Sequence, residues 1–76
     1  MTVKINRDEN QQLISRRETE IVRMMSLGYN SRQIGKMLFI SEQTVQTHRR
    51  NVIKRLGLRN SNHLIAWAFQ VNMLSF

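Results

Sequence analysis

The chain is 76 residues long, which allows one small domain, and its lack of cysteine excludes disulfides and thiolate metal sites. No stretch approaches the roughly 20 apolar residues of a membrane helix. Twelve lysines and arginines against five acidic residues give a formal charge of +7, and this excess predicts a polyanionic partner, with nucleic acid favoured over an anionic membrane surface.

Residues 1–13 are polar and show no sustained hydrophobic period. We therefore expect them to form a flexible tail or the remnant of a linker, and residues 14–76 to form the folded domain. Because no signal-peptide pattern opens the chain, we expect a cytoplasmic protein.

The first helix is expected to begin at Ser15. This serine and Glu18 form a capping box, in which each side chain accepts a hydrogen bond from the other residue's backbone N–H. The buried stripe of this helix should consist of Ile21, Val22 and Met25. Gly28 supplies the left-handed residue that ends such a helix, and we expect Tyr29 to fold back onto Met24.

A second capping box, made by Asn30 and Gln33, predicts the start of the next helix. The residues expected to point into the core are Ile34, Met37 and Leu38. Gly35 costs about 1 kcal/mol relative to alanine in a helix interior. Its presence predicts that a second helix crosses closely at this point.

A very short connection joins the second helix to the third. Only Phe39 and Ile40 separate the second helix from the next cap, Ser41. Two helices joined in this way form a helix-turn-helix. Such turns often hold glycine or a small polar residue, so phenylalanine is unusual there. Phe39 is either a lid over the core or an exposed contact.

The third helix, over about residues 42–56, carries a polar face without a carboxylate. Its core stripe consists of Val45, Val52 and Leu56, and its opposite side carries Gln43, Gln46, Thr47, Arg50 and Lys54. Such amide, hydroxyl and guanidinium groups bond base edges and phosphates in a DNA major groove, which indicates a recognition helix. His48, at the edge of the core stripe, is expected to be a hydrogen-bonded structural residue rather than a pH switch or metal ligand. The helix should end at Gly57, with Leu58 packed back on Ile53.

A fourth helix follows, capped by Asn60. The residues expected to face the core are Leu64, Trp67, Ala68 and Val71. The opposite side carries an apolar stripe of Ile65, Phe69 and Met73. Because an exposed stripe of this kind usually marks an interface, we expect a weak homodimer that forms on DNA through these residues. Together the elements predict an all-α, compact four-helix helix-turn-helix domain.

Several motifs occur in order along the chain: SRRETEIV, GYNSRQIGKML, ISEQTVQTHRRNVIKRLGL and the Leu64–Ile65…Ala68 spacing. From about Ile14 to Ala68 they resemble the LuxR-type (GerE-like) DNA-binding domain of bacterial transcription regulators. The resemblance is specific because it combines Thr44–Val45, His48, Asn51 and Leu56–Gly57 at these spacings. The chain departs from the family's usual residues at Gly35 (usually alanine), Ser61 (often arginine) and Leu64 (often alanine), and the last two changes leave the packing of the fourth helix open.

The resemblance implies sequence-specific binding of double-stranded DNA in bacterial transcription regulation. It places the third helix in the major groove and makes the fourth a common dimerisation element, usually behind a sensor or receiver domain in a longer chain. Carried over by position, the base-reading residues are Gln46, Thr47 and Arg50, and the phosphate contacts are Arg32, Ser41, Thr44, Arg49 and Lys54.

Two other functions fit parts of the sequence. The promoter-recognition domain of a sigma factor uses a similar helix-turn-helix, and a protein-interaction module could dock onto a partner through the fourth helix. We expect no enzymatic activity, no cofactor and no metal site, because the sequence shows no nucleophile–base pairing, phosphate loop or metal-ligand cluster.

Overall fold

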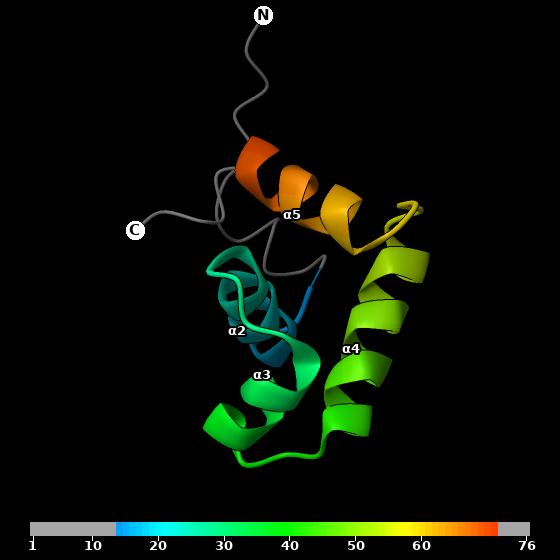
Figure 1. The fold of residues 1–76 in the computed structure, drawn as a ribbon. Coiled ribbons are helices and arrows are strands. Elements are labelled where there is room, and N and C mark those ends of the chain that lie inside the picture. The colour runs from blue at the N-terminus through cyan, green and yellow to red at the C-terminus, as the bar shows by residue number, and fades with distance from the viewer. Residues whose placement is uncertain (1–13, 72–76) are drawn as a thin grey trace, which may run out of the picture.

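The computed structural model describes residues 14–71, and this part of the chain forms four helices and no strand. In chain order they are α2 (Arg16–Ser26), α3 (Ser31–Leu38), α4 (Glu42–Arg55) and α5 (Ser61–Gln70). Figure 1 shows α3 and α4 side by side, joined by a tight turn at one end, with α2 behind α3 and α5 across the opposite end. The expected all-α, four-helix architecture is confirmed. The predicted tail and Met73 lie outside the described residues.

Each helix begins at the predicted cap. The side chain of the N-cap residue accepts a hydrogen bond from the backbone N–H three residues further on at Ser15, Asn30, Ser41 and Asn60. Both predicted capping boxes are complete, because Glu18 Oε1 accepts the Ser15 N–H at 2.8 Å and Gln33 Oε1 accepts the Asn30 N–H at 2.9 Å. Caps of this kind stabilise a helix by about 1 kcal/mol each, so local sequence alone fixes where the four helices start.

The helices α2 and α4 end at the predicted glycines. Gly28 and Gly57 take left-handed conformations, with φ of 96° and 67°. The next backbone N–H bonds a carbonyl five residues back, as in a Schellman ending: Tyr29 bonds Met24 at 3.1 Å and Leu58 bonds Ile53 at 2.9 Å. Side chains of Leu58 and Ile53 both pack against the core.

All four helices contribute to one core. Its buried apolar residues are Ile14, Ile21, Val22, Met25, Ile34, Val45, Val52, Leu64 and Ala68. The prediction for Met37 is wrong, since this side chain is 44% exposed. The buried face of α3 is centred on Ile34, Ser31 and Gly35, because the start of α4 passes over the glycine, and this turns Met37 towards solvent.

The backbone of the turn between α3 and α4 passes very close to Gly35. A Cβ atom at this position would lie 2.7 Å from the carbonyl oxygen of Ile40 and 3.2 Å from the backbone nitrogen of Glu42. The predicted close approach therefore exists. It is made by the turn and the first residue of α4 rather than by the middle of a crossing helix.

Phe39 adopts the left-handed conformation in the turn, with φ of 60°, and its side chain is 94% exposed. It therefore does not form a lid over the core, and the ring is available for a contact with a partner. A left-handed backbone costs a non-glycine residue roughly 1–2 kcal/mol, and the ring recovers none of this cost by burial. Two backbone N–H groups, those of Phe39 and Ile40, bond the Gly35 carbonyl and hold the turn in place.

Candidate nucleic-acid interface

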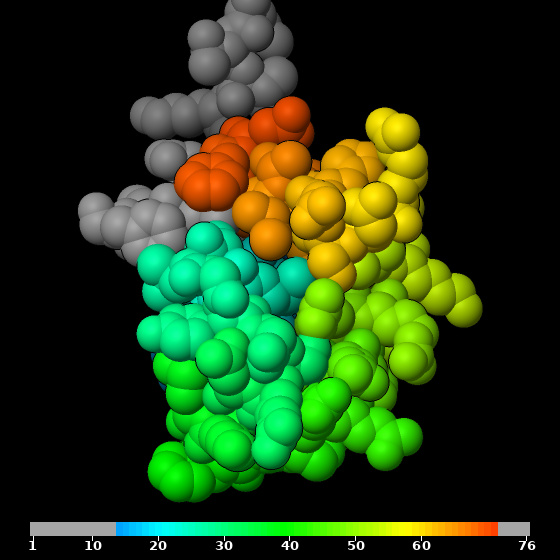
Figure 2. All heavy atoms as spheres, in the orientation of Figure 1, coloured from blue at the N-terminus to red at the C-terminus, as the bar shows by residue number. Residues whose placement is uncertain are grey.

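The polar face predicted for α4 is exposed. Val45 and Val52 anchor the helix in the core, and the side chains on its outer face are Gln43, Gln46, Thr47, Arg50 and Lys54. Figure 2 shows side chains of α4 projecting along one edge of the molecule, beside α3 and α5. The core contacts therefore leave a 14-residue helix with one long polar side open to a partner.

The three predicted base-reading residues, Gln46, Thr47 and Arg50, lie on this face within little more than one turn. The amide of Gln46 donates to Glu42 Oε2 at 3.3 Å. Glu42 lies at the flank of the face, which was expected to be free of carboxylates. The bond to Glu42 occupies one N–H of the Gln46 amide and leaves its second N–H and its oxygen for another partner.

The predicted phosphate contacts occupy two different environments. Arg32, Ser41, Thr44 and Lys54 are exposed. Ser41 and Thr44 are joined at the turn, since the Ser41 hydroxyl donates to Thr44 Oγ1 at 2.8 Å and accepts the Thr44 N–H at 3.0 Å. Arg49, in contrast, is half-buried.

Arg49 reaches from the middle of α4 to two other helices. Its guanidinium donates to the hydroxyl of Ser31 and, at 2.7 Å, to the hydroxyl of Ser61. These serines are the first residues of α3 and α5. Sequence reasoning missed both contacts, and the only available signal was that Arg49 lies nearer the core stripe than its neighbour Arg50.

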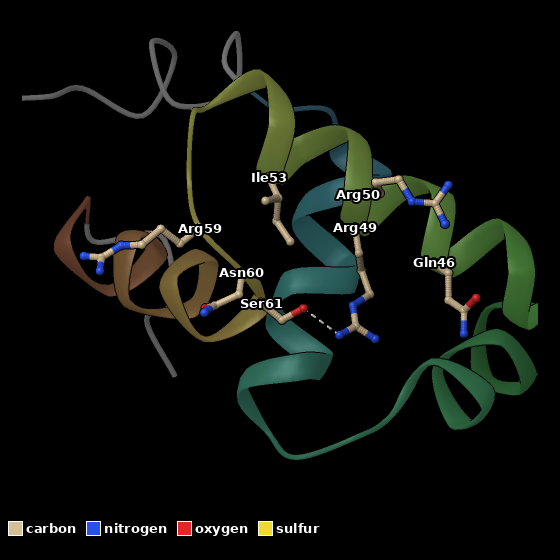
Figure 3. Close-up of a pocket in the computed structure, with 7 residues that line it drawn as sticks. All are labelled: Gln46, Arg49, Arg50, Ile53, Arg59, Asn60 and Ser61. Carbon is tan, nitrogen blue, oxygen red and sulfur yellow. Dashed lines mark hydrogen bonds between the residues drawn. The ribbon is translucent and has the colours of Figure 1, made fainter.

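A shallow groove lies between α4 and the start of α5. It has a volume of about 410 Å³ and is lined by Gln46, Arg49, Arg50, Ile53, Arg59, Asn60 and Ser61. In Figure 3 the Arg49 side chain extends towards Ser61, while Arg50 and Gln46 point away from α5. The backbone N–H of Arg59 donates to Nδ1 of His63 at 3.1 Å, which ties the loop to the first turn of α5.

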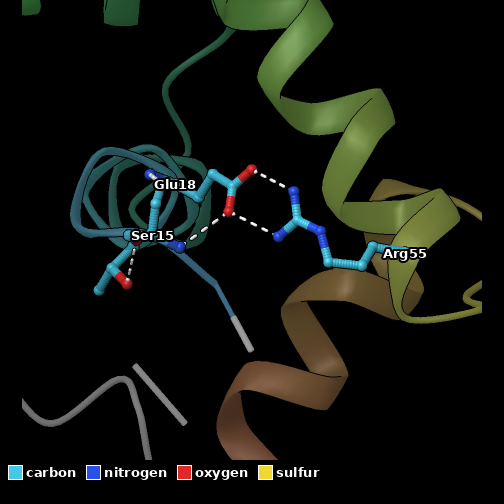
Figure 4. Close-up of polar contacts among 4 residues, drawn as sticks. Ser15, Glu18 and Arg55 are labelled. Carbon is cyan, nitrogen blue, oxygen red and sulfur yellow. Dashed lines mark hydrogen bonds and ion pairs between the residues drawn. The ribbon is translucent and has the colours of Figure 1, made fainter. Parts of the chain in front are cut away.

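The last turn of α4 is held by an ion pair with α2. Arg55 donates two hydrogen bonds to the Glu18 carboxylate, each of 2.9 Å (Figure 4). Glu18 is only 4% exposed, and the hydrogen bonds from Arg55 lower its pKa more than burial raises it. Glu18 was expected only to cap α2, so this ion pair was not predicted. The missed signal was a carboxylate on the buried stripe of Ile21 and Val22, where a buried charge requires a partner.

The outer stripe predicted for α5 is only partly present. Ile65 is half-buried and packs against the core, which contradicts the expectation that it belongs to an exposed stripe. Leu64 and Ala68 define the buried line of the helix, and Ile65 and Trp67 flank it at similar angles, so both reach the core. Phe69 is 55% exposed, as expected.

In residues 14–71, no three potential ligands among histidine, aspartate and glutamate come together to hold a metal ion. None of the four helices is long and apolar enough to cross a membrane. His48 is half-buried at the edge of the core.

The chain is similar to proteins of known class. The family model described as "Bacterial regulatory proteins, luxR family" matches residues 12–68. Oxygen regulatory protein NreC of Staphylococcus aureus (strains JH9 and JH1) is 33% identical over 64 residues, which cover 84% of this chain and 30% of NreC. A solved structure, "Structure of Transcription factor, GerE", is 33% identical with a TM-score of 0.80, and the match covers 83% of this chain and 94% of that one. The chain thus spans about 30% of the length of NreC.

The Glu18–Arg55 pair predicts how the stability of the fold depends on pH. Because the pKa of Glu18 is lowered in the folded state, the pair stabilises the fold above the ordinary glutamate pKa of about 4.3, and this stabilisation is lost as the pH falls through the folded-state value. We expect Glu18→Gln to lower the free energy of unfolding at pH 7 by about 1–3 kcal/mol and to flatten its decline between pH 5 and pH 3. Urea unfolding followed by circular dichroism measures both.

The matched control is Glu20→Gln. Glu20 forms only a half-exposed pair with Arg17 at 3.6 Å, so its loss should cost less than about 1 kcal/mol. If the wild-type chain and Glu18→Gln lose stability equally between pH 5 and pH 3, the Glu18–Arg55 pair does not produce this dependence.

Proposed function

This chain belongs to the luxR family of bacterial regulatory proteins, and from this premise we propose that it binds double-stranded DNA sequence-specifically, with α4 in the major groove. The observation that carries the proposal is the exposed outer face of α4. It presents amide, hydroxyl and cationic side chains from Gln43 to Lys54 along one side of the helix. A B-DNA major groove is about 12 Å wide and admits one such helix.

Base reading is assigned to Gln46, Thr47 and Arg50. Arg50 is exposed and carries a planar fork that matches O6 and N7 of guanine. The Gln46 amide can bond adenine at N6 and N7 through its oxygen and one N–H, because only one of its two N–H groups is used by Glu42. The methyl group of Thr47 suits the thymine methyl group.

Phosphate anchoring is assigned to the exposed residues around this face, namely Arg32, Ser41, Thr44 and Lys54. Arg32 is the second residue of α3, and Ser41 and Thr44 lie at the start of α4, where backbone N–H groups favour an anion. These contacts fix orientation without carrying sequence information. Arg49, which the resemblance adds to this group, lies in a different environment, where it bonds Ser31 and Ser61.

The wider role follows from the relatives. NreC is an oxygen regulatory protein of which the matched segment is 30%, and GerE is a transcription factor. We propose that the present domain acts in the cytoplasm as the output part of a longer regulator, behind a sensor or receiver domain.

We also propose weak dimerisation on DNA through α5, with exposed Phe69 at the centre of the contact. A symmetric pair would match a near-palindromic operator with half-sites one helical turn apart. Because Ile65 packs against the core, the available apolar surface is smaller than the sequence suggested. The dimer contact should therefore be weak without DNA.

The first prediction concerns the salt dependence of DNA binding. If the basic residues of α3 and α4 neutralise about five phosphates, log affinity for mixed-sequence duplex DNA should fall with log salt with a slope of about −4 to −5. Fluorescence anisotropy over a range of salt concentrations measures the slope. A slope indistinguishable from zero would refute DNA binding and favour a protein-interaction module.

A second prediction separates reading from anchoring. Arg50→Ala should weaken binding to the cognate site, identified by selection from random DNA, by about 1–3 kcal/mol of binding free energy. It should weaken binding to mixed-sequence DNA much less. Arg32→Ala should weaken both by similar factors and make the salt slope shallower by about 1. If Arg50→Ala weakens all sequences equally, Arg50 is an anchor and not a reader.

The third prediction concerns the dimer. Phe69→Glu places a charge in the proposed contact, so it should abolish cooperative binding to two half-sites and leave affinity for one half-site unchanged. Binding isotherms on both DNAs test this, with circular dichroism to verify the fold. Unchanged cooperativity would exclude Phe69 from the interface, and loss of helix content would show that the core requires it.

A further inference from the structure

Arg49 and Arg50 are adjacent in α4 but have different surroundings. Arg50 is exposed, whereas Arg49 is half-buried and its guanidinium bonds the hydroxyls of Ser31 and Ser61. Each serine opens a helix, and Figure 3 shows the Arg49 side chain directed towards the start of α5. One side chain therefore connects α4 to both α3 and α5.

The charge of Arg49 does not explain these contacts. Both acceptors are neutral hydroxyls, and both lie in the first turn of a helix, where the helix dipole disfavours a cation. What suits arginine to this position is its shape. The rigid, planar fork sends two N–H groups in different directions, so a single group sets the position of α4 against two helix starts, which the flexible point charge of lysine does not do.

The contacts also lie beside the proposed DNA-binding residues. Ser31 precedes Arg32, the proposed phosphate anchor, and Arg49 precedes Arg50, the proposed base reader. The hydrogen bond between Ser31 and Arg49 therefore links α3, which carries the proposed anchor, to α4, which carries the proposed reader. The distance between α3 and α4 decides whether Arg50 can reach a base while Arg32 holds a phosphate. Phosphate contacts fix the register of the protein on the DNA, and the reading residues must fit that register.

We infer that Arg49 is a positioning residue that couples base reading by Arg50 to phosphate anchoring by Arg32, and that it does not itself contact a phosphate. This inference rests on the proposed function. It assigns Ser31 and Ser61 the role of holding Arg49. It also accounts for the serine at position 61, whose hydroxyl can accept a bond from Arg49 as an arginine could not.

The test compares the specificity ratio, which is affinity for the cognate site divided by affinity for mixed-sequence DNA, with the salt slope. Arg49→Met keeps an unbranched apolar stem and removes the fork. We expect the ratio to fall roughly tenfold, as when part of a bidentate base contact is lost, while the slope on mixed-sequence DNA stays unchanged. A slope shallower by about 1 with an intact ratio would identify Arg49 as a phosphate contact and overturn the inference.

Two further variants keep the positive charge. The specificity ratio should fall in Arg49→Lys, and in the double variant Ser31→Ala, Ser61→Ala, as it does in Arg49→Met. Each of these changes removes the two-point contact. A wild-type ratio in either variant would overturn the inference. The double variant also decides the question if Arg49→Met fails to fold, since small-to-smaller changes at two helix starts disturb the core least.

The matched control is Arg23→Met, at an exposed arginine of α2, which should leave ratio and slope unchanged. An equal loss of ratio there would show that the effect is not specific to Arg49. A parallel fall in affinity on both DNAs, matched by a smaller folded fraction in circular dichroism, would reduce Arg49 to a stabilising role and overturn the inference. Failure of the wild-type chain to bind DNA would refute the proposed function itself, so the two failures are distinguishable.

Discussion

The geometry of the helix pair α3–α4 depends on how closely two backbone segments approach at Gly35. With no side chain on the glycine, the carbonyl oxygen of Ile40 and the backbone nitrogen of Glu42 come within 2.7 Å and 3.2 Å of where a Cβ atom would lie, which is too close for a methyl group. This contact brings the start of α4 against the middle of α3 after a turn of only a few residues. The connection between α3 and α4 also requires the left-handed backbone at Phe39. The small Gly35 and the strained Phe39 therefore together set the direction of α4.

Arginines also hold α4 against the other helices. Three arginines of α4 have different surroundings. Arg55 pairs with the buried carboxylate of Glu18 and ties the last turn of α4 to α2. Arg49 bonds two serine hydroxyls at helix starts. Arg50 remains exposed. The Arg55–Glu18 pair cancels within the net charge of +7. Two of these three guanidinium groups therefore hold α4 in place, and the third lies on its exposed side.

Polar ties of this kind suit so small a domain. A chain of this length buries only about 60% of its unfolded surface, and nine buried apolar residues make up the described core. Hydrophobic packing is non-directional and tolerates small rotations of a helix. Bidentate and two-point hydrogen bonds are directional, so they define the rotation of α4 that places Gln46 and Arg50 on its outer side. The core stabilises the domain, and the polar contacts specify how the outer face of α4 is presented.

Features that depend only on neighbouring residues could be predicted from local sequence patterns. Helix starts at Ser15, Asn30, Ser41 and Asn60 and helix ends at Gly28 and Gly57 follow from hydrogen bonds and backbone conformations within a few residues, so local pattern suffices for them. The outer face of α4 could also be predicted, because helical periodicity separates its two sides.

Tertiary structure decided what depends on the distance between helices. Met37 turns outward because the buried face of α3 is centred near Gly35, and Ile65 turns inward because α5 rests on the core along Leu64 and Ala68. Glu18 and Arg55 lie 37 positions apart, and Arg49 meets serines 18 and 12 positions away. No periodicity or spacing relates such residues, because the angles at which helices cross, and not the order of residues along the chain, bring their side chains within hydrogen-bonding distance.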